Sequence, residues 1–176
     1  GPAFSKEHFQ DLLLTAKDLN INFIRAAHYP YTRHLAKVAD RLGLMLWEEV
    51  PVYWNIDWDN SETLNIATHQ ITRLVQRDQN RASVVVWSVA NETPLSSSRM
   101  KFLNTLISEI EAIDSTRLTT AALLSGSEEE FKALVLVLAL QGVNSQWVNP
   151  SEKAIFQFIL DPANIPIDSE LNFSIS

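Results

Sequence analysis

The segment from Val84 to Pro94 constrains the fold of this chain more than any other part of its sequence. Its first four residues, Val84–Trp87, are apolar and mostly β-branched, which is typical of a strand buried on both faces, as in a parallel sheet. An amide and a carboxylate follow, Asn91 and Glu92, and Thr93-Pro94 then prevents a regular continuation, because the residue before a proline is pushed out of helical geometry. The segment therefore predicts a buried parallel strand that presents Asn91 and Glu92 at its C-terminal end.

Strands and helices alternate about six times along the 176 residues. Apolar runs predict strands over 21–24, 44–47, 84–89, 118–122, the second half of 134–142 and 165–167. Helical periodicity covers 9–19, 35–42, 64–75, 103–113 and 155–159, with Gly43 as the stop of the second helix. The candidate N-caps are Ser5, Asn60 or Ser61, Ser96 to Ser98, and Ser151. This alternation is typical of βα units and a parallel sheet.

Polar residues at the strand ends decide between the two architectures that such units allow, a closed barrel and a doubly wound open sheet. A dinucleotide fold has little support, because no glycine-rich phosphate turn follows any strand. The clusters that follow the strands are Arg25 with His28, Glu48 with Glu49, Asn91 with Glu92, Asn144 with Trp147, and Glu170. Because the C-terminal strand ends of a barrel converge on one mouth, we expect an α/β chain of the (β/α)8 TIM-barrel type, with residues 1–176 as one domain.

Charge and composition limit the partners. The formal net charge of −7 argues against nucleic acid and anionic membrane surfaces as partners. Without cysteine, disulfides and thiolate metal sites are excluded, and the histidines lack metal-ligand spacing, so no metal is expected. The cellular location stays open, since cytoplasmic and periplasmic or secreted compartments both fit a chain without cysteine.

Several short motifs resemble successive landmarks of glycoside hydrolase family 2, which includes β-glucuronidases and β-galactosidases and has a TIM-barrel catalytic domain. They are 22–25, 28–30, 40–44, 49–51, 77–80 and 86–92. The resemblance is close from about residue 22 to residue 94, weaker over 116–121 and loose past Ser125, and Ser88–Glu92 looks somewhat more like β-glucuronidases. A family barrel needs about 250 residues. The resemblance therefore implies an incomplete barrel of about six strands, lacking the first and last.

The resemblance also implies roles for individual residues. Glu92 would be the catalytic acid/base, and Asn91 would hydrogen-bond the sugar 2-hydroxyl. The nucleophile would be Glu170, although Leu171-Asn172 depart from the aromatic and glycine that usually follow it. Arg25, His28 and Glu49 would line the pocket for the terminal sugar, although Arg25 and His28 are alternatively part of a structural ion pair. Apart from the resemblance, we expect substrate contacts from Trp87, which is close to Glu92 in the sequence, and from Asn144 and Trp147 at a later strand end.

The implied function is a retaining glycoside hydrolase that cleaves terminal β-glycosidic bonds with two carboxyl groups about 5 Å apart. No cofactor is implied. The implied partners are a carbohydrate substrate and either the missing domains of a larger enzyme or further copies of the chain. One alternative is a non-catalytic truncated barrel that is structural or binds sugar weakly, and another is a barrel hydrolase of a different family. Glu170 is alternatively an exposed tail carboxylate. Trp54, Trp58 and Trp147 are either stacking platforms for sugar rings or loop anchors.

Overall fold

The computed structural model describes residues 5–123, 140–143 and 158–160. The helices are α1 (Lys6–Asp18), α2 (Arg33–Leu42), α3 (Ser61–Asp78) and α4 (Ser97–Ile113). The strands are β1 (Phe23–Ala26), β2 (Met45–Glu49), β3 (Val84–Asn91), β4 (Leu118–Leu123), β5 (Leu140–Val143) and β6 (Phe158–Leu160). All six strands form one sheet in the order of the sequence. Strands β1 to β5 pair in parallel and β6 pairs antiparallel to β5.

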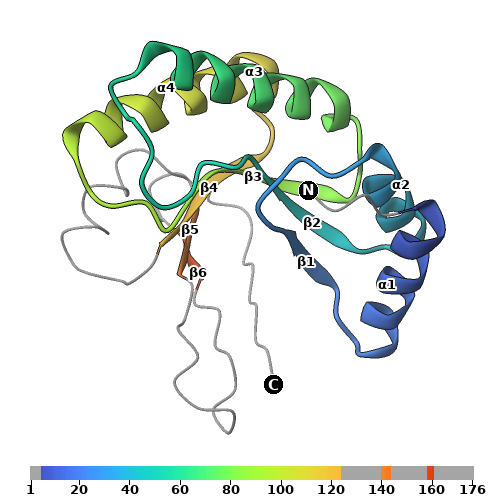
Figure 1. Cartoon of the computed structure of the whole chain (residues 1–176). Coiled ribbons are helices and arrows are strands. Elements are labelled where there is room, and N and C mark those ends of the chain that lie inside the picture. Colours follow the sequence, from blue (N-terminus) through green and yellow to red (C-terminus); the bar gives the residue numbers. More distant parts are fainter. Residues whose placement is uncertain (1–4, 124–139, 144–157, 161–176) are drawn as a thin grey trace, which may run out of the picture.

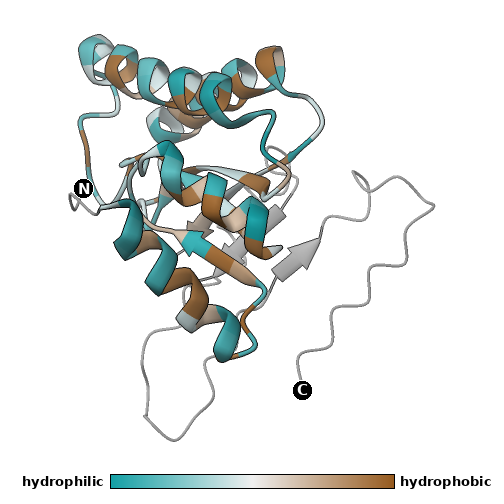
Figure 2. Cartoon of the chain, turned by 90° about the vertical axis from the view of Figure 1, so that its right-hand side faces the viewer, coloured by the Kyte–Doolittle hydropathy of each residue, from teal (hydrophilic) through white to brown (hydrophobic). Residues whose placement is uncertain are grey.

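The helices lie along one side of the sheet, in an arc that runs from α1 and α2 to α3 and α4 (Figure 1). Helix α1 packs against α2, and α3 packs against α4. Hydrophilic and hydrophobic residues alternate along the helices at the front of Figure 2, as expected for helices that cover a sheet on one face and meet water on the other. Within the described residues, none of these helices is long and apolar enough to cross a membrane.

The helix ends follow the capping residues of the sequence. The side chains of Ser5, Asn60 and Ser96 accept hydrogen bonds from backbone N–H groups in the first turns of α1, α3 and α4. These bonds satisfy donors that have no partner inside the helix. Gly43 ends α2 in the left-handed conformation, at φ 66°. The expected caps of these four helices, with Asn60 rather than Ser61 at α3, are therefore confirmed.

Two apolar layers form on opposite faces of the sheet. The larger layer lies between the sheet and the helices and includes Leu46, Trp87 and Phe102. The smaller layer contains Trp47, Val86 and Ala122. Successive side chains of a strand point to opposite faces, so Leu46 on the helix side places Trp47 on the inner face of the sheet.

The expected fold class is confirmed: the chain has the α/β architecture of the TIM-barrel type, with a sheet that is parallel from β1 to β5 and whose described strands cover part of a barrel. One prediction is wrong. Residues 158 and 159 were expected to end a helix, and they belong to strand β6. A short apolar run such as Phe158–Leu160 does not distinguish helix from strand by periodicity. The strand expected over 165–167 and the helical part over 151–157 lie outside the described residues.

Candidate active site

Three adjacent strands bring Arg25, Glu49 and Asn91 together at their C-terminal ends. The guanidinium of Arg25 donates from Nε to Oε2 of Glu49 at 3.0 Å and from Nη2 to Oε1 at 3.2 Å. The same Nη2 donates to Oδ1 of Asn91 at 2.5 Å. Paired, charge-assisted bonds of this kind fix both side chains in one geometry. The convergence expected for Arg25, Glu49 and Asn91 is therefore observed.

His28 joins this cluster from the loop that follows β1. Its Nδ1 lies 2.6 Å from Oε1 of Glu49, whose side chain is only 1% exposed. Tyr31 supports the loop, because its hydroxyl donates to the carbonyl of Ala27 at 2.8 Å. The buried Glu49 carboxylate thus meets Arg25 on one side and His28 on the other, which compensates the removal of its charge from water.

The end of β3 is irregular. This irregularity directs the side chains of two consecutive polar residues, Asn91 and Glu92, toward the site. The pairing of β3 with β4 shifts between Ser88 and Asn91, where three steps along β3 face two along β4. Glu92 then adopts a left-handed backbone conformation, with φ at 51°. Regular alternation would send neighbouring side chains to opposite faces, and a bulge or a left-handed residue breaks that alternation. Asn91 and Glu92 both reach partners at this end of the sheet.

Backbone bonds hold this irregular segment in place. The N–H of Asn91 donates to the carbonyl of Val52 at 2.8 Å, and the N–H of Glu92 donates to the carbonyl of Ala122 at 2.8 Å. Left-handed geometry at a residue other than glycine costs about 1–3 kcal/mol and persists where the surroundings over-determine it. Such strain is concentrated at functional sites, which agrees with the position of Glu92.

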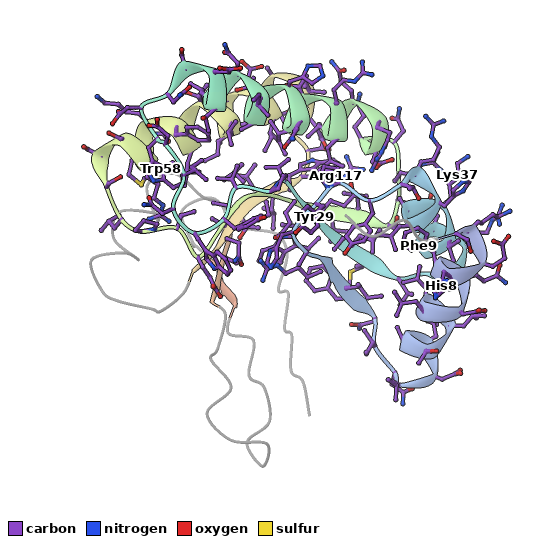
Figure 3. The ribbon with its side chains drawn as sticks, viewed as in Figure 1. His8, Phe9, Tyr29, Lys37, Trp58 and Arg117 are labelled. Atoms are coloured by element: carbon purple, nitrogen blue, oxygen red, sulfur yellow. The ribbon has the colours of Figure 1, made fainter. Side chains whose placement is uncertain are left out.

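The loop after β2 supplies a partner for Glu92. Trp54 donates from Nε1 to Oε2 of Glu92 at 3.2 Å, and its backbone N–H donates to the carbonyl of Asn91 at 3.1 Å. Trp58, in the same loop, instead lies at the helix layer beneath α4 (Figure 3). Its ring meets Phe102 edge-on, with centroids 5.3 Å apart. Trp58 is thus a loop anchor, whereas Trp54 faces the site.

Glu48 and Glu49 point to opposite faces of the sheet, as their adjacency in a strand requires. Glu48 is 2% exposed and its Oε1 lies 3.9 Å from Nη2 of Arg77 on α3. Burial, followed by the nearby carboxylate of Asp78, raises the pKa of Glu48 to about 8, against the opposing effect of Arg77. Glu48 therefore belongs to the contact between sheet and helices, and only Glu49 lies at the site.

The expectation that Trp87 contacts substrate is corrected by its surroundings. Its side chain has no exposed surface, and it belongs to the apolar layer between sheet and helices. Its Nε1 donates to Oδ2 of Asp114 at 2.9 Å, and the guanidinium of Arg117 lies 5.8 Å from its ring centroid. Trp87 therefore packs β3 against the end of α4. It lies in the same strand as the site and points away from it.

Three expected site residues, Asn144, Trp147 and Glu170, lie outside the described residues. The distance between the carboxyl groups of Glu92 and Glu170 is therefore not part of this structure. Among the residues that the structure describes, no group of three or more His, Cys, Asp or Glu side chains has the arrangement of a metal site.

The sequence did not predict that Trp54 contacts Glu92 or that the ring of Tyr53 packs against Trp54. The Tyr53 and Trp54 rings are edge-on, with centroids 5.6 Å apart. One signal was present in the sequence: both residues follow the strand that ends in Glu49, and in a barrel the loops after the strands build the active-site face.

The arrangement offers two chemical capabilities. Arg25, His28, Glu49 and Asn91 form a buried polar cluster of donors and acceptors of the kind that orients a hydroxyl-rich ligand. Glu92 is half-buried beside this cluster, and a carboxyl group in such a position is of the type that transfers protons.

Comparison with known proteins identifies the family of the chain. Residues 1–138 match the family described as "Glycosyl hydrolases family 2, TIM barrel domain". A putative beta-glucuronidase of Formosa agariphila is 36% identical over 94 residues, which cover 52% of this chain and 11% of that protein. A beta-galactosidase of Thermoanaerobacterium thermosulfurigenes is 32% identical over 103 residues, which cover 58% of this chain and 14% of that protein.

Solved structures give the same result. The crystal structure of a Bacteroides uniformis beta-glucuronidase aligns with a TM-score of 0.74 at 25% identity, covering 82% of this chain and 19% of that chain. The present chain therefore spans between about a tenth and a fifth of the length of the proteins it matches.

Proposed function

The chain belongs to glycoside hydrolase family 2, and from this we propose that it carries the acid/base half of a retaining active site that cleaves terminal β-glycosidic bonds. Glu92 is the proposed general acid/base. The substrate is a β-glucuronide or a β-galactoside, since similar proteins carry the names beta-glucuronidase and beta-galactosidase. The observation that carries the proposal is the position of Glu92, directly after β3 and beside the Arg25–Glu49–Asn91 cluster.

Each residue of the cluster has a proposed role. Asn91 binds the 2-hydroxyl of the terminal sugar, and Arg25 holds Asn91 in position through the bond to its Oδ1. Arg25, His28 and Glu49 line the pocket for that sugar. Hydrogen bonds to the 2-hydroxyl strengthen as the transition state forms, so a fixed Asn91 contributes to rate as well as to binding.

The proposed reaction is a double displacement. Glu92 donates its proton to the glycosidic oxygen while Glu170 attacks the anomeric carbon, so the bond to the leaving group breaks and a glycosyl ester forms. Glu92 then takes a proton from water, which attacks the same carbon and releases both the sugar and the carboxylate of Glu170. The role of Glu170 rests on the resemblance alone.

Hydrolysis of 4-nitrophenyl β-D-glucuronide and 4-nitrophenyl β-D-galactoside tests this proposal. We expect Glu92→Gln to lower kcat/KM by about 10²–10⁴, because the amide can neither donate nor accept the required proton. The matched control is Glu111→Gln, an exposed residue of α4. A Glu92→Gln variant as active as the control contradicts the assignment. Absence of hydrolysis by the unmodified chain, together with calorimetric binding of the free sugar, supports the non-catalytic alternative.

A further inference from the structure

A row of two aromatic residues, Tyr53 and Trp54, links His28 to Glu92, and Tyr29 packs against Tyr53 from a second loop. The ring centroid of Tyr53 lies 5.8 Å from that of His28, 6.4 Å from that of Tyr29 and 5.6 Å from that of Trp54. The neighbouring side chain of Tyr53 raises the pKa of Tyr29. Tyr29 lies in the loop after β1 (Figure 3) and Tyr53 in the loop after β2.

Trp54 is the exposed end of this row. Its side chain is 64% exposed, although tryptophan is highly buried on average. Trp58, four residues further along the same loop, packs against Phe102. The loop therefore uses one tryptophan as an anchor and presents the other to solvent.

The exposed ring is held in a defined position. Its Nε1 bonds to Glu92, its backbone N–H bonds to Asn91, and Tyr53 meets it edge-on. The backbone of Trp54 is left-handed, with φ at 56°, a conformation that costs a residue other than glycine about 1–2 kcal/mol. Strained residues cluster at active sites and ligand clamps, so this exposed, fixed ring is a candidate binding surface.

The relative depths of the side chains indicate which part of a substrate this ring meets. Glu49 and Asn91 are 1% and 4% exposed, so the proposed pocket for the terminal sugar lies deepest. An acid that protonates the glycosidic oxygen stands between the sugar and its leaving group. Trp54 bonds to that acid and lies at the solvent side, where the leaving group extends.

We propose that Trp54, backed by Tyr53, is a platform for a ring-shaped leaving group, so that the site favours β-glycosides of aryl or other flat aglycones over those of small alkyl groups. This rests on the proposed function, since it takes Glu92 as the group at the glycosidic oxygen. An aromatic ring stacks on an aromatic face, and such pairs are worth roughly a two- to tenfold change in affinity.

Non-hydrolysable thioglycosides test the platform by binding alone. Calorimetry compares phenyl and methyl 1-thio-β-D-glucuronide, and the matching 1-thio-β-D-galactosides, which differ only in the leaving group. We expect the phenyl compound to bind roughly two- to tenfold more tightly. Trp54→Ala removes this preference, so that the phenyl and methyl compounds bind this variant with equal affinity. Trp54→Phe keeps a ring without Nε1 and retains most of the preference. The matched control is Trp58→Phe, which behaves as the unmodified chain.

Each result has one meaning for the platform. Equal affinity for the two compounds, no binding of either at millimolar concentration, or a preference that survives Trp54→Ala overturns it. Circular dichroism verifies that the variants are folded. If hydrolysis depends on Glu92 but the preference for the phenyl compound does not depend on Trp54, the platform is overturned and the proposed function is retained. A preference that depends on Trp54, combined with hydrolysis indifferent to Glu92, overturns the proposed function and supports Trp54 as a platform for aromatic groups that acts without Glu92.

Discussion

Arg25 binds Glu49 through two hydrogen bonds, from Nε to Oε2 at 3.0 Å and from Nη2 to Oε1 at 3.2 Å. The guanidinium also lies over the ring of Trp47, 4.9 Å from its centroid. One side chain on β1 is thereby tied to β2 by charge and by stacking, and to Asn91 on β3 by a third bond. The site and the packing of its three strands depend on the same contacts.

We expect Glu49→Gln to lower the free energy of unfolding by about 3 kcal/mol, because removal of one partner leaves the charge of Arg25 uncompensated in a mostly buried position. Urea denaturation followed by circular dichroism measures the change. Glu111→Gln, exposed on α4, is the control and changes stability by less than about 0.5 kcal/mol. A Glu49→Gln variant as stable as this control means that the pair adds nothing to the fold.

The buried carboxyl group of Glu48 makes the free energy of unfolding depend on pH. Its pKa of about 8 in the folded chain lies above the ordinary value of 4.5, so the folded state holds a proton that the unfolded state has lost. Stability from this group is fully present below pH 4.5 and is lost as the pH rises through 8, at no more than about 1.4 kcal/mol per pH unit. We expect Glu48→Gln, which resembles the protonated form, to remove this decline.

The measurement is urea denaturation of Glu48→Gln and the unmodified chain from pH 5 to pH 9. The free energy of unfolding of Glu48→Gln rises relative to that of the unmodified chain as the pH rises. The free energy of unfolding of Glu111→Gln equals that of the unmodified chain at every pH. Parallel curves for Glu48→Gln and the unmodified chain mean that Glu48 titrates alike in the folded and unfolded states.

Much of the fold was readable from the sequence because local signals and burial agreed. Ser5, Ser96 and Gly43 mark helix ends by their own chemistry. Val84, Val86 and Trp87 of the apolar run are buried in the two layers on opposite faces of the sheet. The alternation of Glu48 and Glu49 follows from strand geometry and holds in the structure. Phe158–Leu160 was misread because three apolar residues carry no usable period.

Only part of the candidate site could be predicted from the sequence, and the reason is physical. Residues at strand ends are predictable as a group, and this brought Arg25, Glu49 and Asn91 together correctly. The direction of a side chain near a strand irregularity cannot be predicted in this way, because it depends on a bulge and on a residue with left-handed backbone geometry. Trp87 was assigned to the substrate by proximity in sequence, and its bond to Asp114 emerges only when α4 is packed on β3.

Asp114 provides a test in acid. Burial raises the pKa of its carboxyl group, and hydrogen bonds from Thr116, Trp87 and Arg117 outweigh burial and lower the pKa to about 2. The stabilisation is present above the ordinary pKa of 3.8 and is lost as the pH falls through 2. We expect Asp114→Asn to cost roughly 2 kcal/mol at pH 7 and progressively less from pH 4 downward.

Urea denaturation at pH 7, 4 and 3 measures this difference, with Asp11→Asn on the exposed side of α1 as the control. A cost that is the same at all three pH values assigns the effect of Asp114→Asn to lost packing. In that case the charge of Asp114 does not stabilise the contact between β3 and α4.

At Gly43 the cost of a left-handed backbone conformation can be measured without a steric clash. It ends α2 at φ 66°, and a Cβ atom added there meets no atom within 4 Å, so a substitution introduces strain without a clash. We expect Gly43→Ala to lower the free energy of unfolding by about 1 kcal/mol, because left-handed geometry disfavours residues with a Cβ. Gly43→Asn is the matched variant and costs less, since asparagine tolerates this conformation better. Urea denaturation of the three proteins gives the order Gly, Asn, Ala in decreasing stability. An alanine variant more stable than glycine means that the loss of freedom in the unfolded chain outweighs the strain, and that this end of α2 relaxes out of the left-handed region.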